Sequence, residues 1–213
     1  MKLGILMLDT RFPRIPGDIG NAATFSCEVE YAVVPRASVA RLVAAEPDPA
    51  LLGAFVDAGR KLVARGCHRI TTSCGFLVLW QKQLAGALEV PVVSSSLLLL
   101  PRLQDAGVLT FDPATLGSRH LAAAGASADT PWEGLQPRDS LYRTIAEDRV
   151  ELDQATAQNE VIAAGRRLLQ RAPRIKNIVL ECTNFGPYRP ALARSLGLPV
   201  HGIVEALSDP AFQ

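Results

Sequence analysis

Two cysteines occupy matching places in a chain that repeats itself. Cys74 follows Ile70-Thr71-Thr72-Ser73 and Cys182 follows Ile178-Val179-Leu180-Glu181, and a Pro-Val pair begins seventeen residues after each cysteine, at Pro91 and Pro199. A thiol at the carboxyl end of a parallel strand lies where ligands bind in open α/β sheets. The amides and the dipole of a helix that begins there favour the thiolate, which is the basic and nucleophilic form. The spacing therefore predicts a site served by two thiols.

The repeat also predicts how these thiols lie relative to each other. If the two halves of the chain face each other, a pseudo-twofold axis puts Cys74 and Cys182 on opposite sides of one cleft. One thiolate then removes a proton from a carbon, and the opposite thiol delivers a proton to the other face, which inverts the stereocentre. Each enantiomer presents its hydrogen to a different side, so a symmetric pair favours a racemase or epimerase.

A second pair of motifs extends the repeat. Gly4–Asp9 and Gly107–Asp112 each contain a glycine, a short apolar run and an aspartate five residues after the glycine. These motifs lie 103 residues apart and the two cysteines 108, so the halves match in order. The duplication predicts the α/β class, with two pseudosymmetric parallel-sheet domains and the active site in the cleft between them. Residues 1–101 form the first expected domain and 102–213 the second, with a C-terminal segment that can cross back to the first.

Short runs of Val, Ile and Leu predict buried parallel strands, and longer stretches with one apolar face predict helices. The expected strands are residues 2–8, 29–34, 69–73 and 90–94 in the first half, and 107–111, 177–181 and 199–204 in the second. One helix is expected to begin at Pro49, after the cap Asp48, and to end before Gly66; another covers 152–171. Residues 112–150 are expected to be the least regular region.

The composition is that of a soluble globular protein and excludes several classes. The 213 residues include 48% hydrophobic and 20% charged side chains. A net charge of +1 argues against a nucleic acid as the main partner. The apolar run near the N-terminus is too short to span a membrane and lacks a cleavage site, so neither a membrane segment nor a signal peptide is expected. Four cysteines without a CxxC pair predict reduced thiols and a cytoplasmic location.

No metal and no cofactor are expected. The three histidines are scattered, and the cysteines form no cluster of the kind that binds metals. Neither a GxGxxG fingerprint nor a P-loop follows the first strand. The predicted ligand is therefore a small molecule that the chain handles with its own side chains.

These motifs resemble a known family. Thr72–Gly75 and Glu181–Asn184 are similar to the two cysteine motifs of the aspartate/glutamate racemase superfamily, and Asp9–Asn21 looks like the first active-site loop of its uncharacterised members. The resemblance implies proton abstraction and return by Cys74 and Cys182 without pyridoxal phosphate or metal. It also implies a small substrate that carries a carboxylate, and a homodimer or larger homo-oligomer.

The chain departs from the family beside each cysteine. Gly75 and Phe76 follow the first cysteine, where Asn-Thr is usual, and Asn184 stands where Glu or His is frequent. These departures keep the two thiols and leave the substrate open.

Other residues near the motifs are candidates for holding the substrate. Asp9 either caps a turn or binds an ammonium group, and the loop residues Arg11 and Arg14 are either solvated or hold a carboxylate. Amides and side chains that follow the cysteines either cap helices or stabilise an enolate-like charge as it develops. The substrate-binding candidates are Asp9, Arg11, Ser73, Gly75, Phe76, Thr115, Thr183 and Asn184.

Two other functions stay open. A decarboxylase or cis–trans isomerase on the same scaffold would use one cysteine to protonate or attack the substrate. A binding protein for small acids that has lost turnover is the other alternative, because Gly75, Phe76 and Asn184 replace polar residues of the family. The three hypotheses differ in how many thiols the reaction needs.

Overall fold

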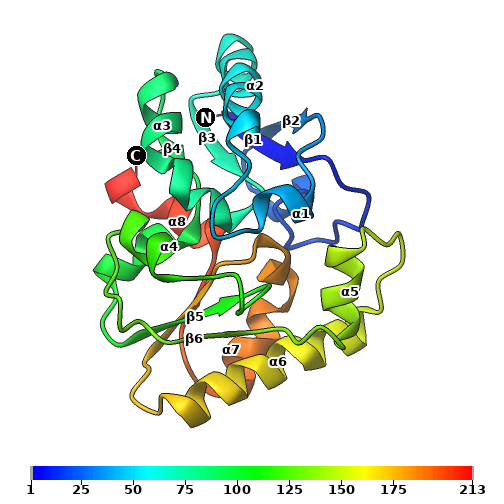
Figure 1. Cartoon of the computed structure of the whole chain (residues 1–213), viewed down its shortest axis with the longest axis vertical. Helices are drawn as coiled ribbons and strands as arrows, with labels where there is room; N and C mark the ends of the chain where they lie inside the picture. The colour runs from blue at the N-terminus through cyan, green and yellow to red at the C-terminus, as the bar shows by residue number, and fades with distance from the viewer. Residues whose placement is uncertain (1, 213) are drawn as a thin grey trace.

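Two parallel sheets of four strands organise the structure, a computed structural model that describes residues 2–212 (Figure 1). The first sheet has the strand order β2-β1-β3-β4 and the second β6-β5-β7-β8, so the halves share one topology. The strands are β1 (Lys2–Leu8), β2 (Glu28–Val34), β3 (Arg69–Thr72), β4 (Val92–Val93), β5 (Ala106–Thr110), β6 (Trp132–Gly134), β7 (Asn177–Leu180) and β8 (Val200–His201). The expected α/β class with two pseudosymmetric parallel-sheet domains is confirmed.

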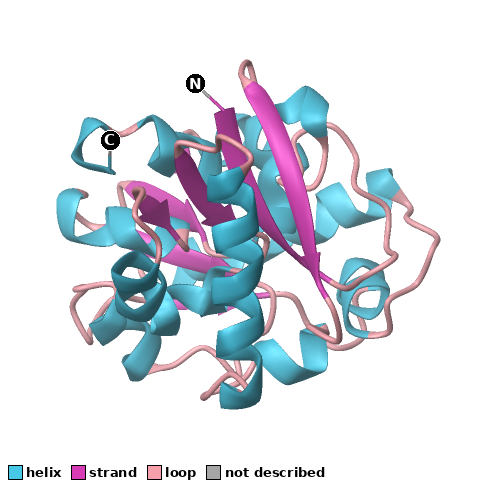
Figure 2. Cartoon of the chain, turned by 90° about the horizontal axis from the view of Figure 1, so that it is seen from above, coloured by secondary structure: helices cyan, strands magenta, loops and turns pink. Residues whose placement is uncertain are grey.

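Helices surround the two groups of strands (Figure 2). The α-helices are α1 (Val39–Leu42), α2 (Leu52–Ala64), α3 (Gln81–Ala87), α4 (Ser118–Ala123), α5 (Ser140–Ala146), α6 (Gln154–Arg171), α7 (Arg189–Leu196) and α8 (Ile203–Ser208). Shorter 3-10 segments are η1 (Ala22–Thr24), η2 (Pro49–Leu51), η3 (Gly75–Trp80), η4 (Ser96–Arg102), η5 (Thr183–Tyr188) and η6 (Pro210–Phe212). No helix in residues 2–212 is long and apolar enough to cross a membrane.

The first long helix shows how local sequence sets these elements. Asp48 accepts a hydrogen bond from the backbone N–H of Ala50 at 3.0 Å, and Pro49 begins the 3-10 turn that leads into α2. Phe55 and Leu62 lie on the buried face of α2 and anchor it on the first sheet. The chain then reverses at Gly66, whose φ of 83° favours glycine. The predicted start and stop of this helix are confirmed.

Three predicted segments differ from the structure. The strand expected over 199–204 is limited to β8, because the chain turns at Gly202, whose N–H binds the Glu205 carboxylate at 2.8 Å and starts α8. The strand expected over 90–94 is limited to β4. Residues 112–150 contain α4, β6 and α5, which sequence reasoning missed. The Trp-Glu-Gly of β6 is too short to form an apolar run, and α4 and α5 are only six and seven residues long.

The C-terminal helix lies on the first domain. Ile203, Ala206 and Leu207 of α8 share a buried cluster with Leu3 and Ile5 of β1. A guanidinium from β3 donates to the carbonyl of Leu207, and an ion pair of 3.0 Å joins η4 to Asp209. The last segment of the chain therefore fastens the second domain to the first.

Candidate active site

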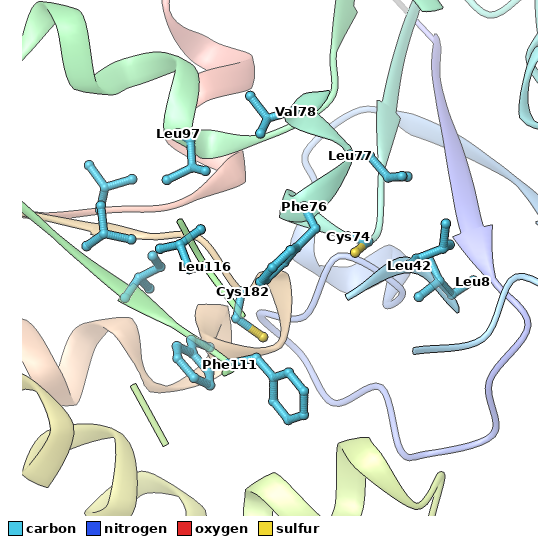
Figure 3. Packing of buried hydrophobic residues seen from close by; sticks show 14 of the residues in the cluster. Leu8, Leu42, Cys74, Phe76, Leu77, Val78, Leu97, Phe111, Leu116 and Cys182 are labelled. Atoms are coloured by element: carbon cyan, nitrogen blue, oxygen red, sulfur yellow. The ribbon is translucent and has the colours of Figure 1, made fainter. Parts of the chain in front are cut away.

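Cys74 and Cys182 line one cavity between the two sheets (Figure 3). β3 ends at Thr72 and β7 at Leu180, so each cysteine stands two residues after its strand and directly before a 3-10 turn. The cavity volume is only about 30 Å³, which is room for a water molecule but not for an organic acid. The structure thus brings the two predicted thiols to one closed space.

The wall of this cavity is mostly apolar. The side chains that form its apolar part are Leu8, Phe12, Val39, Val43, Phe76, Phe111 and Ile145. Phe76 meets the ring of His120 edge to face, with centroids 4.7 Å apart, and Phe111 stacks on Tyr142 at the same distance. α1 and α5 supply Val39 and Ile145, so the region expected to be irregular helps to close the site.

Burial changes the acidity of the thiols in the direction opposite to the sequence-based expectation. The backbone amides of Phe76 and Leu77 bind the Cys74 sulfur and that of Asn184 binds Cys182, as expected for helix N-termini. Desolvation outweighs these bonds, and the nearby Glu181 adds to it, so the pKa of Cys74 rises to about 12 and that of Cys182 rises well above its usual value. Burial therefore favours the neutral thiol form of both groups.

Glu181 lies in the cavity wall, at the last position of the strand expected over 177–181. β7 ends at Leu180, so the alternation of side chains along a strand does not extend to Glu181, whose N–H binds the carbonyl of Leu109 at 2.8 Å. Its Oε2 accepts a hydrogen bond from the Thr110 hydroxyl at 2.7 Å. Burial raises the pKa of this carboxyl to about 7. Sequence reasoning did not place this titratable group in the site, although its position directly before Cys182 is a signal that could have located it.

A polar chain connects Cys182 to the loop after β1. The Cys182 thiol lies 3.6 Å from Oδ1 of Asn184, whose amide donates to Asp18 at 2.7 Å. Asp18 is buried and pairs with Arg14 at 3.1 Å, and the Arg14 guanidinium stacks on Phe12 at 4.1 Å. Sequence reasoning gave Asp18 no role, although it belongs to the Asp9–Asn21 loop. Arg14 and Phe12 of that loop line the cavity, so the loop covers the thiols.

The predicted residues Ser73, Gly75, Thr183 and Asn184 also line the cavity, together with Phe76. The Thr183 hydroxyl donates to the carbonyl of Ser73 at 2.8 Å and joins the two cysteine turns. A Cβ at Gly75 would overlap both the carbonyl and the Oε1 of Glu181, so only glycine permits this close approach. These contacts hold the two cysteine turns against each other.

Three predicted substrate-binding residues lie outside the cavity wall. Asp9 is exposed and accepts a hydrogen bond from the N–H of Arg36, which is the turn-capping alternative. Arg11 is 76% exposed and pairs with Asp148 across the domains at 3.1 Å, so Arg14, not Arg11, is the loop cation at the cavity. Thr115 bonds to Asp112 within a turn. In each case the side chain is occupied by local or interdomain hydrogen bonds.

A larger pocket shares Cys182 and Thr183 with the cavity. Its volume is about 290 Å³, and it is bounded by the loop at Pro16 and Gly17 and by the 3-10 turn η5. Within residues 2–212 no group of three His, Cys, Asp or Glu side chains is arranged to hold a metal ion. The chemistry that this site can support comes from two thiols, one carboxyl and one guanidinium.

Two curated relatives are similar to nearly the whole chain. A dimethylsulfoniopropionate lyase of Durusdinium sp. clade D is 28% identical over 216 residues, 95% of this chain and 71% of that protein. Dimethylsulfoniopropionate lyase 7 of Emiliania huxleyi is 27% identical over 233 residues, 98% of this chain and 65% of that protein. Across the curated relatives that it matches, the chain spans between 42% and 71% of their length. No protein-family model matches the chain.

Solved structures with this architecture include a decarboxylase and racemases. An arylmalonate decarboxylase superimposes with a TM-score of 0.65 at 16% identity, over 98% of this chain and 92% of that one. The allantoin racemase from Klebsiella pneumoniae gives 0.61 at 17%, over 96% and 83%. The glutamate racemase from Aquifex pyrophilus gives 0.55 at 18%, over 98% and 81%. The chain has the fold of the aspartate/glutamate racemase superfamily.

The proteins that share this racemase fold are enzymes with different reactions. Their names include decarboxylase and racemase among the structures, and lyase among the sequence relatives. The resemblance inferred from the cysteine motifs is confirmed at the level of the fold. The fold alone does not select among these reactions, so the choice depends on the groups that surround the two thiols.

Proposed function

We propose that this chain is an enzyme in which a cysteine thiolate removes a proton from the carbon next to a carboxylate. One observation carries the proposal: two thiols from equivalent strand ends line one closed, largely apolar cavity. A carbon acid of this kind needs a base held close to its hydrogen and a site that stabilises the enolate-like charge. The amides at the two cysteine turns, and the Arg14 guanidinium that also pairs with Asp18, can supply that stabilisation.

Elimination is the reaction that we place first. In an onium propionate such as dimethylsulfoniopropionate, the thiolate takes a proton from the carbon beside the carboxylate. The electron pair then forms a C=C bond, and the C–S bond breaks so that dimethyl sulfide leaves with its pair and acrylate remains. The rings of Phe76 and Phe111 are suited to a sulfonium cation, because aromatic faces attract cations, whereas the ring of Phe12 already contacts the Arg14 guanidinium. The similarity to two lyases named for this substrate supports the choice.

A cationic substrate also counteracts the raised pKa of the two thiols. In the empty site, burial and the Glu181 charge hold Cys74 and Cys182 in the neutral form. A positive charge bound among the same side chains favours the thiolate and lowers its pKa. Binding of the onium group therefore prepares the base that the reaction needs.

Racemisation is the second candidate, and the pairing of the thiols favours it. Inversion needs a base on one face of the carbon and an acid on the other, which Cys74 and Cys182 offer from equivalent positions. Elimination needs one base only. The two reactions therefore predict different behaviour of the two cysteine variants.

The test uses Cys74→Ser and Cys182→Ser with the wild-type protein as reference. Dimethylsulfoniopropionate is supplied in deuterated water, with dimethyl sulfide followed by gas chromatography and acrylate by NMR. Elimination predicts that one substitution abolishes acrylate formation and the other is milder. A panel of chiral amino and hydroxy acids, scored for α-deuterium exchange, tests racemisation, in which each single variant exchanges only one enantiomer. If neither substitution affects any turnover, the thiol mechanism is wrong.

A further inference from the structure

Glu181 has a carboxyl oxygen with no partner at the point where the two cysteine turns meet. The residue is 1% exposed, and its Oε2 is bound by Thr110. Within the described residues its Oε1 has no hydrogen-bond partner, although a buried carboxylate oxygen is costly to leave unpaired. The same oxygen faces Gly75, the residue after Cys74, and the side chain lines the cavity with both thiols. Such an oxygen is typical of a group that exchanges a proton or binds a ligand.

The other titratable groups around this oxygen are already engaged. Arg14 and Asp18 are paired with each other, and Asp18 also accepts from Asn184. The buried imidazole of His120 contacts Phe76 edge to face and accepts from the N–H of Gly117 at Nδ1; its Nε2 has no partner among the described residues, but His120 does not line the cavity. Among the residues that line the cavity, Glu181 is therefore the carboxyl group with an unpaired oxygen.

We propose that Glu181 is the acid–base partner of the two thiols and takes the proton from the cysteine that becomes the base. This proposal rests on the proposed function and deepens it. The S–H bond of the cysteine breaks and an O–H bond forms on Glu181, so the total charge of the site does not change. The resulting thiolate takes the substrate proton and becomes a thiol again. In elimination the Glu181 proton is released to solvent when the site opens; in inversion it returns to the opposite cysteine, which has given its own proton to the carbon.

The charge balance explains why a closed site needs such a partner. A thiol in a cavity without solvent has nowhere to send its proton, and a second negative charge beside Glu181 is disfavoured. Glu181 raises the pKa of both Cys74 and Cys182, which shows that its charge acts on both. Its own pKa of about 7 lets it change protonation near neutrality. The proton can therefore move within the cavity while the loop stays closed.

The first experiment measures the coupling without any substrate. Cys182 also lines the larger pocket of about 290 Å³, so iodoacetamide reaches it without opening of the loop, and its alkylation is followed by peptide mass spectrometry between pH 5 and pH 10. In the wild type, the alkylation rate rises to about pH 7 and then flattens, because Glu181 and a thiol share one negative charge in this range. In Glu181→Gln the rate continues to rise through this range. A wild-type rate that shows no plateau, or the same profile in both proteins, overturns the proposal.

The second experiment separates proton transfer from a mere effect of charge. Removal of the Glu181 charge makes the thiols more reactive to iodoacetamide above pH 7, yet turnover of dimethylsulfoniopropionate should fall roughly 100-fold or more at pH 8. If Glu181 only suppresses the thiolates, turnover rises together with alkylation, and that result overturns the proposal. A misfolded variant is recognised because Cys67, which is buried elsewhere, becomes reactive as well.

Two further variants keep the test independent of that one substitution. The Thr110 hydroxyl binds Oε2 and holds the pKa of Glu181 down. Thr110→Val removes this hydroxyl, so the pKa of Glu181 rises and the alkylation plateau should begin at a higher pH. Glu46→Gln, whose side chain is 68% exposed, is the matched control and should change neither profile. If the wild type turns over no carboxylate substrate, the proposed function fails, while the alkylation profiles still decide the role of Glu181.

Discussion

Gly75→Ala tests the contact that joins the two cysteine turns. A Cβ at this position overlaps the backbone carbonyl of Glu181 as well as its Oε1. The side chain can rotate, but the backbone is held because the N–H of Glu181 binds Leu109 at 2.8 Å. Forcing extra volume into a packed interior costs about 1–3 kcal/mol. For a chain of this length each kcal/mol shifts Tm by about 2–4 °C, so a loss of about 2–12 °C is expected.

The same substitution at Gly86 is the matched control. Gly86 lies in α3, and no atom lies within 4 Å of the Cβ that alanine would add there. Alanine replaces glycine in a helix with a gain of up to about 1 kcal/mol, so Tm should rise or stay constant. Both variants are compared with the wild type by thermal unfolding followed by circular dichroism. A Gly75→Ala protein that melts within about 1 °C of the wild type refutes the argument that the turns are in direct contact.

Three other substitutions test separate parts of the structure. The raised pKa of Glu181 means that the folded protein binds the carboxyl proton more tightly than the unfolded chain does. The wild type therefore loses stability as the pH rises from about 4.5 to 7. The stability of Glu181→Gln relative to the wild type, measured by urea unfolding, should increase by roughly 3 kcal/mol between pH 4.5 and pH 8. Asp148→Asn weakens the bonds to the N–H groups of Arg11 and Phe12 by about 1 kcal/mol, and iodoacetamide should label Cys74 about fivefold faster. Phe55→Ala should cost about 3–5 kcal/mol in the same urea assay while turnover per folded molecule stays unchanged, because Phe55 packs on Trp80 outside the cavity wall.

The internal repeat explains why so much of the fold could be predicted. Strands buried on both faces have mostly apolar sequences, and β1, β5 and β7 are such strands, while β3 is buried but reads Arg-Ile-Thr-Thr and was located through the repeat. The central strand of each sheet and the strand that carries each cysteine were therefore visible. β6 was missed because it is a three-residue edge strand whose Trp132 and Glu133 are only partly buried. The end of β8 was missed because Ile203 and Val204 are apolar but belong to a helix.

Site residues could be predicted from the sequence when the end of a strand determines their position. They could not be predicted when their position depends on pairing with a distant side chain. Cys74, Cys182 and their neighbours follow from the ends of β3 and β7. The choice between Arg11 and Arg14 depends on partners that are distant in sequence, because Asp148 lies 137 residues from Arg11. Glu181 was not placed in the site, because the strand expected over 177–181 runs one residue past the end of β7. Long-range contacts of this kind leave no periodic signal in the sequence.

The closed cavity implies an order of events for any substrate. A space of about 30 Å³ does not hold a propionate between the two thiols, so the loop that carries Phe12 and Arg14 must move before both thiols can contact a substrate. This loop is held to the second domain at two points, by Asp148 through two backbone N–H groups and by Asn184 through Asp18. Opening breaks polar contacts and hydrates the thiols, and closure over a substrate removes water again. Because the acidity of both thiols depends on that burial, loop closure and base strength are linked. A substrate that carries a positive charge favours thiolate formation after closure, and Glu181 takes the proton that the thiol gives up.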